Sequence, residues 1–341
     1  MKRFIYHNKF LLTVFLIGLT VQGATQDLHF SQFFEAPLLR NPSLAGIYTG
    51  DIRVQAVYRD QWNSVTTAYK TASLNAEYKM PVGKSYDFIT AGLQMMYDRA
   101  GSAVWVTNHV LPAINYHKSL SDQKNMYLSA GFMGGWVQSR IDRSKITTNS
   151  TYDGLGDGEN FPSDQFNYFD AAAGLSFNTQ LNDNEENNIF LGVAYHHFNK
   201  PEASFYGNGS AELEPKIVGS AGIRFGVTPA SYLTILSDFS TQGSYREIIG
   251  GALYGLKLGA YDLEKPLYTI HGGAFLRWND AFIPVIKLDY NPFSVAFSYD
   301  VNISKLKTSS LGRGGFEVAL SYIGFTNRNN SVLNALHCPR F

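Results

Sequence analysis

An alternation of large apolar residues with small or polar ones constrains this chain more than any other feature. In residues 294–304 every odd position is large and apolar, and every even position is small or polar. Successive side chains of a β-strand point to opposite faces, so such a segment has one apolar and one polar face. The same period of two recurs in residues 52–59, 71–80 and 316–322. The pattern predicts an all-β protein.

Read along the whole chain, the alternation predicts fourteen strands. We place them at 51–60, 68–80, 88–98, 104–118, 124–138, 165–180, 186–199, 215–227, 230–242, 245–258, 266–278, 281–290, 293–304 and 315–326. Bacterial single-chain barrels have even strand numbers, and about ten residues suffice for a strand to cross a bilayer. Short turns alternate with long polar loops at 139–164, 200–214 and 305–314, which is typical of barrels. Pro112 and Pro284 fall inside predicted strands, where a missing N–H predicts a bulge or bend.

A secreted β-sandwich would show the same alternation, so composition decides between the two folds. Charged residues are 16% of the chain and aromatic residues 14%, whereas an average soluble protein is roughly 25% charged. Aromatic side chains suited to a bilayer interface crowd the strand ends, at Tyr58, Trp62, Tyr97, Tyr116, Trp136, Tyr195, Trp278, Tyr290 and Phe325. The polar face carries charges that a dry sandwich core would reject, at Arg53, Glu77, Arg224, Glu247, Lys287, Asp289, Asp300 and Glu317. We therefore expect a transmembrane antiparallel up-and-down β-barrel over residues 49–326.

The two ends of the chain lack the strand period. Residues 1–25 have a basic start, an apolar run too short to cross a bilayer as a helix, and small residues at the end, which together predict a signal peptide. An anchor helix is the alternative. Residues 26–48 are too apolar for a free tail, so we expect either a plug in the lumen or a lid on its periplasmic side. Residues 327–341 form a C-terminal tail that holds the sole cysteine, Cys338.

The sequence offers little catalytic chemistry. It contains no Gly-x-Ser-x-Gly, His-Glu-x-x-His or Cys-x-x-Cys motif, so we expect neither an enzyme nor a cofactor. His196 and His197 adjoin on a predicted strand, where they would face opposite ways and could not act as a pair. A weak calcium hypothesis rests on Asp153, Asp157 and Glu159, which alternate with glycines; a flexible loop is the alternative. The net charge of zero argues against nucleic acid binding.

Several blocks of sequence together resemble the PorP/SprF family. They are His29-Phe30-Ser31-Gln32-Phe33, Pro37-Leu38, Asn41-Pro42-Ser43-Leu44-Ala45-Gly46, Tyr58-Arg59-Asp60-Gln61-Trp62, Ala68-Tyr69-Lys70-Thr71 and Cys338-Pro339-Arg340-Phe341. The order and spacing of these blocks span nearly the whole chain after the signal peptide. In many membrane barrels the final aromatic residue closes the last strand, whereas Phe341 lies beyond the last predicted strand here.

The resemblance implies an outer-membrane component of the type IX secretion system of Bacteroidota. Such a protein would help to export or anchor surface proteins, such as gliding adhesins, that carry a C-terminal sorting domain. Its partners would be outer-membrane lipid, this cargo and other type IX components. A plugged channel or transporter for hydrophobic solutes, or a membrane-edge hydrolase, are the alternatives. We expect Arg53, Arg59 and Glu77 to make lumen contacts with the N-terminal segment, or else to form ion pairs within the wall.

Overall fold

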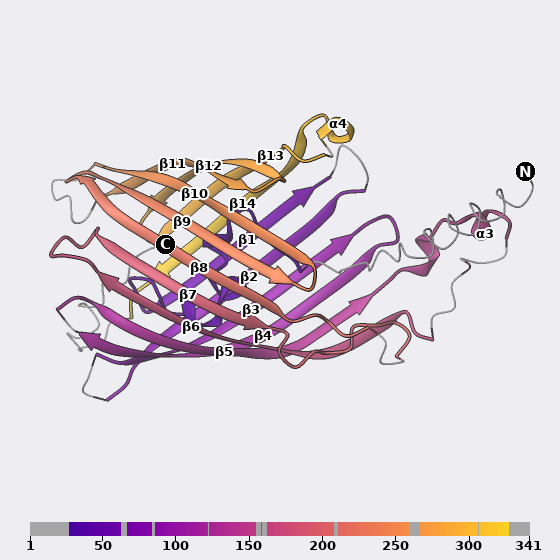
Figure 1. Cartoon of the computed structure of the whole chain (residues 1–341), viewed down its shortest axis with the longest axis horizontal. Coiled ribbons are helices and arrows are strands. Elements are labelled where there is room, and N and C mark those ends of the chain that lie inside the picture. Colours follow the sequence, from indigo (N-terminus) through magenta and orange to yellow (C-terminus); the bar gives the residue numbers. More distant parts are fainter. Residues whose placement is uncertain are drawn as a thin grey trace, which may run out of the picture.

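The computed structural model describes residues 27–326 except 63–66, 84–85, 122, 155–157, 159–161, 208–210, 260–265 and 306. The predicted signal peptide and C-terminal tail, with Cys338, lie outside the described residues. Fourteen strands form one closed ring (Figure 1). They are β1 (Ile52–Gln61), β2 (Tyr69–Pro81), β3 (Phe88–Ala100), β4 (Trp105–Ser121), β5 (Met126–Arg140), β6 (Gln165–Gln180), β7 (Asn188–His196), β8 (Lys216–Thr228), β9 (Ser231–Gln242), β10 (Tyr245–Leu258), β11 (Tyr268–Arg277), β12 (Ala281–Tyr290), β13 (Phe293–Asn302) and β14 (Arg313–Gly324).

Each strand pairs antiparallel with its neighbours in sequence, and β1 closes the ring on β14. The closing register runs from Ile52 opposite Gly324 to Gln61 opposite Gly315. The predicted barrel and its fourteen strands are confirmed. Closure suits a bilayer because hydrocarbon offers backbone N–H and C=O groups no other partner. None of the helices in the described part of the chain is long and apolar enough to cross a membrane.

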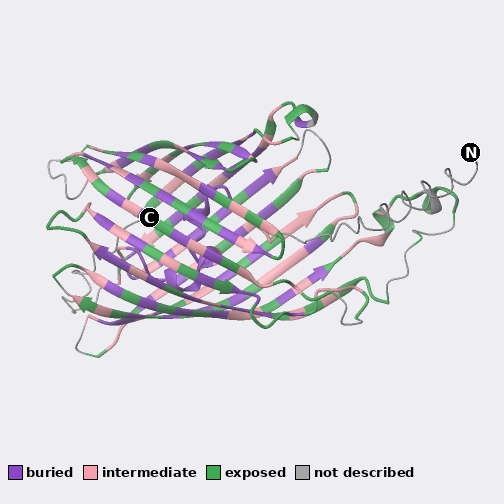
Figure 2. Cartoon of the chain, viewed as in Figure 1, coloured by how far each residue is buried: buried purple, intermediate pink, exposed green. Residues whose placement is uncertain are grey.

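Buried and exposed residues alternate along the strands (Figure 2). The buried set is rich in polar residues, and the exposed set is rich in large apolar ones. In β1, the inward Arg53, Gln55 and Arg59 are buried, whereas the outward Tyr58 is exposed. The other aromatic residues predicted at the bilayer interface are likewise exposed, namely Tyr97, Tyr116, Trp136, Tyr195, Trp278, Tyr290 and Phe325, while Trp62 is half-buried. The alternation that predicted the strands therefore also separates a lipid-facing wall from a polar lumen.

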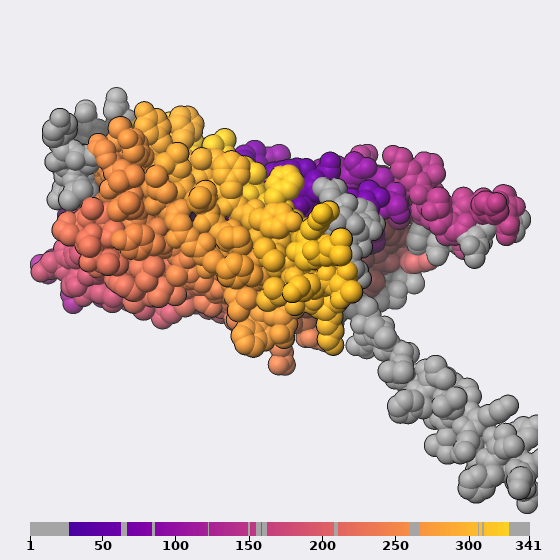
Figure 3. Space-filling view, turned by 90° about the horizontal axis from the view of Figure 1, so that it is seen from above, coloured from indigo at the N-terminus to yellow at the C-terminus, as the bar shows by residue number. Residues whose placement is uncertain are grey.

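The long loops predicted from the sequence all lie at one rim, but that rim also has tight connections, at 243–244 and 278–280. We call the end where β1 begins and β14 ends the turn rim, and the opposite end the loop rim. The turn rim has tight connections such as 229–230 and 291–292. The loop rim carries the long connections: 141–164, with η3 (Arg143–Lys145) and α3 (Asn149–Tyr152); 197–215; and 303–312, with α4 (Lys307–Ser310). The loop that bears α3 projects well beyond the body of the barrel (Figure 3).

The bulges predicted at Pro112 and Pro284 are absent from the described strands. At each proline the pairing with one neighbour is interrupted, but the register is the same on both sides of the gap. The register shifts lie instead at Ser119/Ser121, Gly226/Thr228 and Tyr299/Val301. A proline removes only one ladder bond, and the continuous pairing on its other side, with Leu93 and Ala274 respectively, keeps the strand in register.

Residues 27–48 lie inside the ring. They fold into three short helices, η1 (Phe33–Glu35), α2 (Pro37–Arg40) and η2 (Pro42–Leu44), and η2 contacts β4, β5, β6 and β7. Proline opens α2 and η2, where its missing N–H would have no helical partner in any case. Phe33 and Phe34 pack against Phe275 of β11, with ring centroids 5.3 Å apart in both pairs. We call residues 27–48 the lumenal segment.

Candidate functional site

Near the loop rim the lumenal segment is held by a buried group of alternating charges, the Arg59 cluster: Arg59, Arg277, Asp300 and Glu317. Arg59 lies 2.9 Å from the Asp300 carboxylate and 3.1 Å from that of Glu317, and Arg277 lies 2.6 Å from Asp300. All four side chains are at most 4% exposed. The two cations balance the two anions. Removal of any one of the four side chains would leave a buried charge without its counter-charge and so destabilise the protein.

The Arg59 cluster binds the first turn of the lumenal segment through its backbone. Glu317 accepts hydrogen bonds from the N–H groups of Ser31, at 2.6 Å, and Gln32, at 2.8 Å. Ser31 Oγ donates to Asp300 at 2.8 Å, and Arg59 donates to the carbonyl of His29 at 2.5 Å. Charge-assisted bonds of this kind are about twice as strong as neutral ones. The block His29–Phe33 and the block Tyr58–Trp62 of the sequence therefore meet in space.

A second ion pair holds the segment toward the turn rim. Arg53 donates two hydrogen bonds to Glu77 Oε1, at 3.1 and 2.7 Å, and one to Oε2 at 2.9 Å. Glu77 in turn accepts from the N–H of Gly46 at 2.7 Å, and Arg53 lies over the ring of Tyr48 at 4.4 Å. Arg53, Arg59 and Glu77, the candidate residues from the sequence, thus all contact the lumenal segment.

Two further ion pairs were not singled out by sequence reasoning. Arg40 of α2 forms a bidentate pair with Asp238 of β9, and Glu35 of η1 pairs with Lys287 of β12. Glu35 also accepts from Gln55 at 3.0 Å. Residues 28–48 contain no Asp, Glu, Lys or Arg besides Glu35 and Arg40, and these two charges are the signal that could have indicated buried partners.

The Asn41-Pro42 block sits in a cradle of glycines on the inner wall. An added Cβ at Gly131 would lie 2.5 Å from the carbonyl carbon of Pro42, and one at Gly174 would lie 1.9 Å from Asn41 Oδ1. The Asn41 amide donates to the strand carbonyls of Leu175, at 3.2 Å, and Val193, at 3.1 Å. The side-chain oxygen of Asn41 also accepts from Ser43 N at 2.9 Å and caps η2. Only glycine lets the two backbones approach this closely.

The other residues of these sequence blocks differ in how deeply they are buried. Phe30 is buried beneath the wall, and His29 lies 3.7 Å from Glu247. Tyr58 points outward, and Gln61 ends β1. Trp62 follows with a left-handed φ of 65°, and its N–H donates to the carbonyl of Gly314. Gln61 and Trp62 therefore lie at the loop rim, where β1 ends.

The prediction that His196 and His197 face opposite ways is wrong. β7 ends at His196, and His197 takes a left-handed φ of 55°, so both rings turn inward and both are buried. His196 bonds to the carbonyl of Arg40 at 3.1 Å. His197 lies between two carboxylates, with Nδ1 2.8 Å from Asp170 and Nε2 3.1 Å from Asp27. The strand rule of opposite faces does not apply across the end of a strand.

His197 fixes the start of the lumenal segment by charge. Burial alone lowers the pKa of His197, but the nearby carboxylate of Asp27 and the hydrogen bonds with Asp170 and Asp27 outweigh burial and raise it to about 10. Burial raises the pKa of Asp27, yet Lys216 and His197 bring it well below its usual value. The imidazolium is therefore the form present at neutral pH.

We expect this contact to weaken at alkaline pH. The pKa of His197 is raised on folding, so its stabilising contribution is complete below the unfolded value of 6.5 and is lost as pH rises through about 10. Subtilisin cleavage within residues 27–33, normalised to an unfolded peptide, should accelerate severalfold between pH 7 and 10.5. His197→Gln, which carries no charge at any pH, should be cleaved faster at pH 7 and show no such pH dependence. Equal pH ratios in the two proteins would contradict the assignment.

The calcium hypothesis gains no support from the described residues. Asp157 and Glu159 lie outside them, and Asp153 is exposed. Among the residues that the structure describes, no three His, Cys, Asp or Glu side chains converge as metal ligands.

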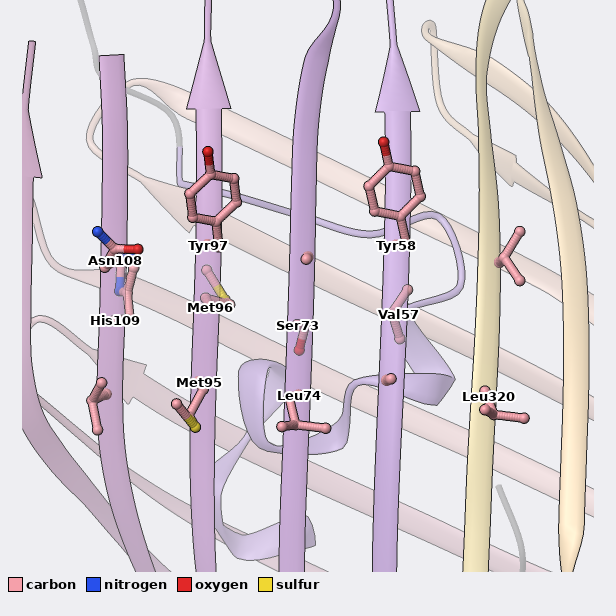
Figure 4. A pocket seen from close by; sticks show the side chains of 14 residues that line it. Val57, Tyr58, Ser73, Leu74, Met95, Met96, Tyr97, Asn108, His109 and Leu320 are labelled. Atoms are coloured by element: carbon pink, nitrogen blue, oxygen red, sulfur yellow. The ribbon is translucent and has the colours of Figure 1, made fainter. Parts of the chain in front are cut away.

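One hollow among the described residues lies on the outer wall of the barrel. It is a depression of about 530 Å³ across β14, β1, β2, β3 and β4. Figure 4 shows Tyr58 and Tyr97 near its loop-rim end, and Leu74, Met95 and Leu320 further toward the turn rim. Its lining is mostly apolar, as is usual on the outward face of a transmembrane barrel.

These features define a class: an outer-membrane β-barrel with a polar lumen that contains its own N-terminal segment. Solved structures agree on the fold. The toluene transporter TodX of P. putida matches with a TM-score of 0.52 at 10% identity, covering 86% of this chain and 95% of that one. A deltaS2S3 mutant of TodX, a monoaromatic hydrocarbon channel, matches with a TM-score of 0.50 at 11% identity, covering 84% and 93%. At such identities the likeness shows the fold alone.

The sequence match is more specific. Residues 22–322 match the family described as type IX secretion system membrane protein PorP/SprF, and the chain belongs to this family. No curated protein matches the sequence significantly. Of the blocks that carried the resemblance, His29–Phe33 meets Tyr58–Trp62 at the end of β1, and Asn41–Gly46 meets the glycine cradle, whereas Cys338–Phe341 lies outside the described residues.

Proposed function

We propose that this barrel binds proteins exported by the type IX system and helps to export or anchor them at the cell surface, without catalysis. The cargo would carry a C-terminal sorting domain, and other type IX components would be further partners. Membership of the PorP/SprF family supports the system. The observation that supports a binding role is that ion pairs hold the lumenal segment inside the barrel. Because the segment occupies the lumen, a partner would bind at the loop rim.

Little space is left between the lumenal segment and the neighbouring described strands, which supports binding of a partner over passage of a solute. A void of about 40 Å³ separates the segment from β8, β9 and β10 and is lined by residues such as Phe33, Leu39 and Ile249. A cavity needs about 10–15 Å³ to hold one water molecule, so this void suits a few waters at most. Signal-peptide cleavage before residue 27 would leave the segment docked as a plug.

A channel or transporter for hydrophobic solutes is the second candidate. Its support is the fold shared with TodX, which is described as a toluene transporter. In this case the lumenal segment would have to move, because the ion pairs described above otherwise hold it in place.

Affinity capture from native membranes in mild detergent, followed by mass spectrometry, tests the choice. We expect recovery of a surface protein with a C-terminal sorting domain and, in planar bilayers, no steady conductance by the pure barrel. Recovery of the barrel alone, together with conductance or saturable uptake of an aromatic hydrocarbon, would favour the second candidate. Turnover of an ester substrate by pure protein would contradict both.

A further inference from the structure

The ring of strands is uneven at the loop rim, and there one edge of β6 extends past its neighbour β7. β6 pairs with β5 along its full length, up to Gln165 opposite Arg140. Its pairing with β7 stops earlier, at Ala172 opposite His196. Residues 165–171 of β6 therefore project beyond β7, and the β5–β6 hairpin continues into the loop that bears α3 (Figures 1 and 3).

Contacts with the 197–215 loop show which backbone groups face this open edge. The carbonyl of Ala171 accepts from Phe198 N at 3.4 Å, and its N–H donates to Asn199 Oδ1 at 3.1 Å. Asn199 Nδ2 donates to the carbonyl of Phe169 at 2.6 Å. Backbone groups alternate sides along an antiparallel strand, so Asn167 also directs its N–H and C=O away from β5.

Beyond Asn199 the edge is open. Neither the N–H nor the C=O of Asn167, nor the N–H of Phe169, has a hydrogen-bond partner among the residues that the structure describes. At the end of the strand, Ser163 Oγ accepts from Gln165 N and donates to Gln165 O, and so caps it. Residues 165–169 also contain no charge and no proline, the features by which proteins protect an exposed edge.

An aromatic surface lies beside this edge, which we call the aromatic shelf: Trp105, Phe166, Tyr168 and Phe205. Phe205 packs edge-on against Phe166 and Trp105, with centroids 4.7 and 5.3 Å apart, and Trp105 is 42% exposed. On the outer face, Trp136 and Phe169 are opposite each other and exposed, as befits the bilayer interface. The open edge at Asn167 is therefore on the cell-surface side of that interface.

We propose that this edge accepts an extended segment of the exported protein, which adds to β6 as a further strand. The inference rests on the proposed function and names its site. An extended backbone offers donors and acceptors at the two-residue spacing of Asn167 and Phe169, and alternate side chains of the added strand would contact the aromatic shelf. The segment would accordingly have large apolar residues at every second position.

Two variants of Asn167 separate backbone from side chain. Asn167→Pro removes an N–H that pairs with none of the described residues, so the barrel should keep its heat-modified gel shift while captured exported protein falls about tenfold. Asn167→Ala keeps the N–H and should capture normally. Equal capture by a folded Asn167→Pro would overturn the proposal. If the wild-type chain captures no exported protein, the proposed function itself fails.

Crosslinking in the otherwise unchanged chain keeps the test independent of folding. A photoreactive residue at Phe169 should crosslink to the exported protein in native membranes. The same residue at Phe177, which lies on the same strand but between paired neighbours, should not. Crosslinking of equal strength at both positions would overturn the proposal, as would a product at Phe169 with twice the mass of this chain, which would indicate a second copy.

Discussion

Replacing Arg59 with methionine is expected to release the lumenal segment while the strands remain paired. The change removes the only cation within reach of Glu317 in the Arg59 cluster and the donor to the His29 carbonyl. Breaking a buried ion pair by removing one partner costs about 3–5 kcal/mol, because the other charge is left uncompensated. The docked population should then fall by at least a hundredfold.

Trypsin reports this release directly. Arg40 is the only lysine or arginine in residues 27–52, and it is buried against Asp238 when the segment is docked. Cleavage after Arg40 should be at least a hundredfold faster in Arg59→Met micelles than in wild type. Arg246→Met, which removes an exposed arginine from β10, serves as the control and should leave the rate unchanged. Protection of Arg40 in Arg59→Met would mean that the Arg59 cluster does not hold the segment.

Gly131→Val is expected to displace the segment by sterics instead of charge. A Cβ at this position would lie 2.5 Å from backbone atoms of both Pro42 and Ser43, which cannot rotate away as a side chain could. Overpacking costs about 1–3 kcal/mol even where side chains can adjust, so we expect cleavage at Arg40 to accelerate at least tenfold. In planar bilayers the variant should conduct ions, since the polar lumen would fill with water.

Gly272→Val is the matched control for this experiment. It makes the same change within a strand, at a position where an added Cβ meets nothing within 4 Å. It should remain protected from trypsin and closed in bilayers. If Gly131→Val is cleaved quickly but does not conduct, the segment is not what closes the lumen. If it stays protected, η2 has another way to fit the wall.

The strands were predictable because their signal is local. An inward residue such as Asn75 and its outward neighbour Leu74 differ in polarity at once, so the period of two fixes both the strand and its faces. The predictions were wrong where a strand ends or where pairing with a neighbouring strand decides the backbone conformation. At His197 a left-handed residue stops β7 earlier than the alternation indicated, and at Pro112 an intact neighbour pairing prevents the bulge that proline favours.

The candidate site was predictable only as a set of residue types. The sequence placed Arg53, Arg59 and Glu77 on the polar face, but no local rule names their partners. Glu317 binds Ser31 across 286 positions of sequence, and Arg40 finds Asp238 across 198. Such pairs depend on which strands the closed ring brings around the segment.

The sequence by itself thus determined the strand class, the lipid-facing and lumen-facing sides, and the segment that differs from the rest. These follow from side-chain chemistry repeated at a fixed backbone period. Only the tertiary structure decided that the segment runs through the lumen, which charges hold it, and where β6 outreaches β7. Ring closure sets these distances, because it fixes the register of every strand against its neighbours and so positions residues that are remote in the chain.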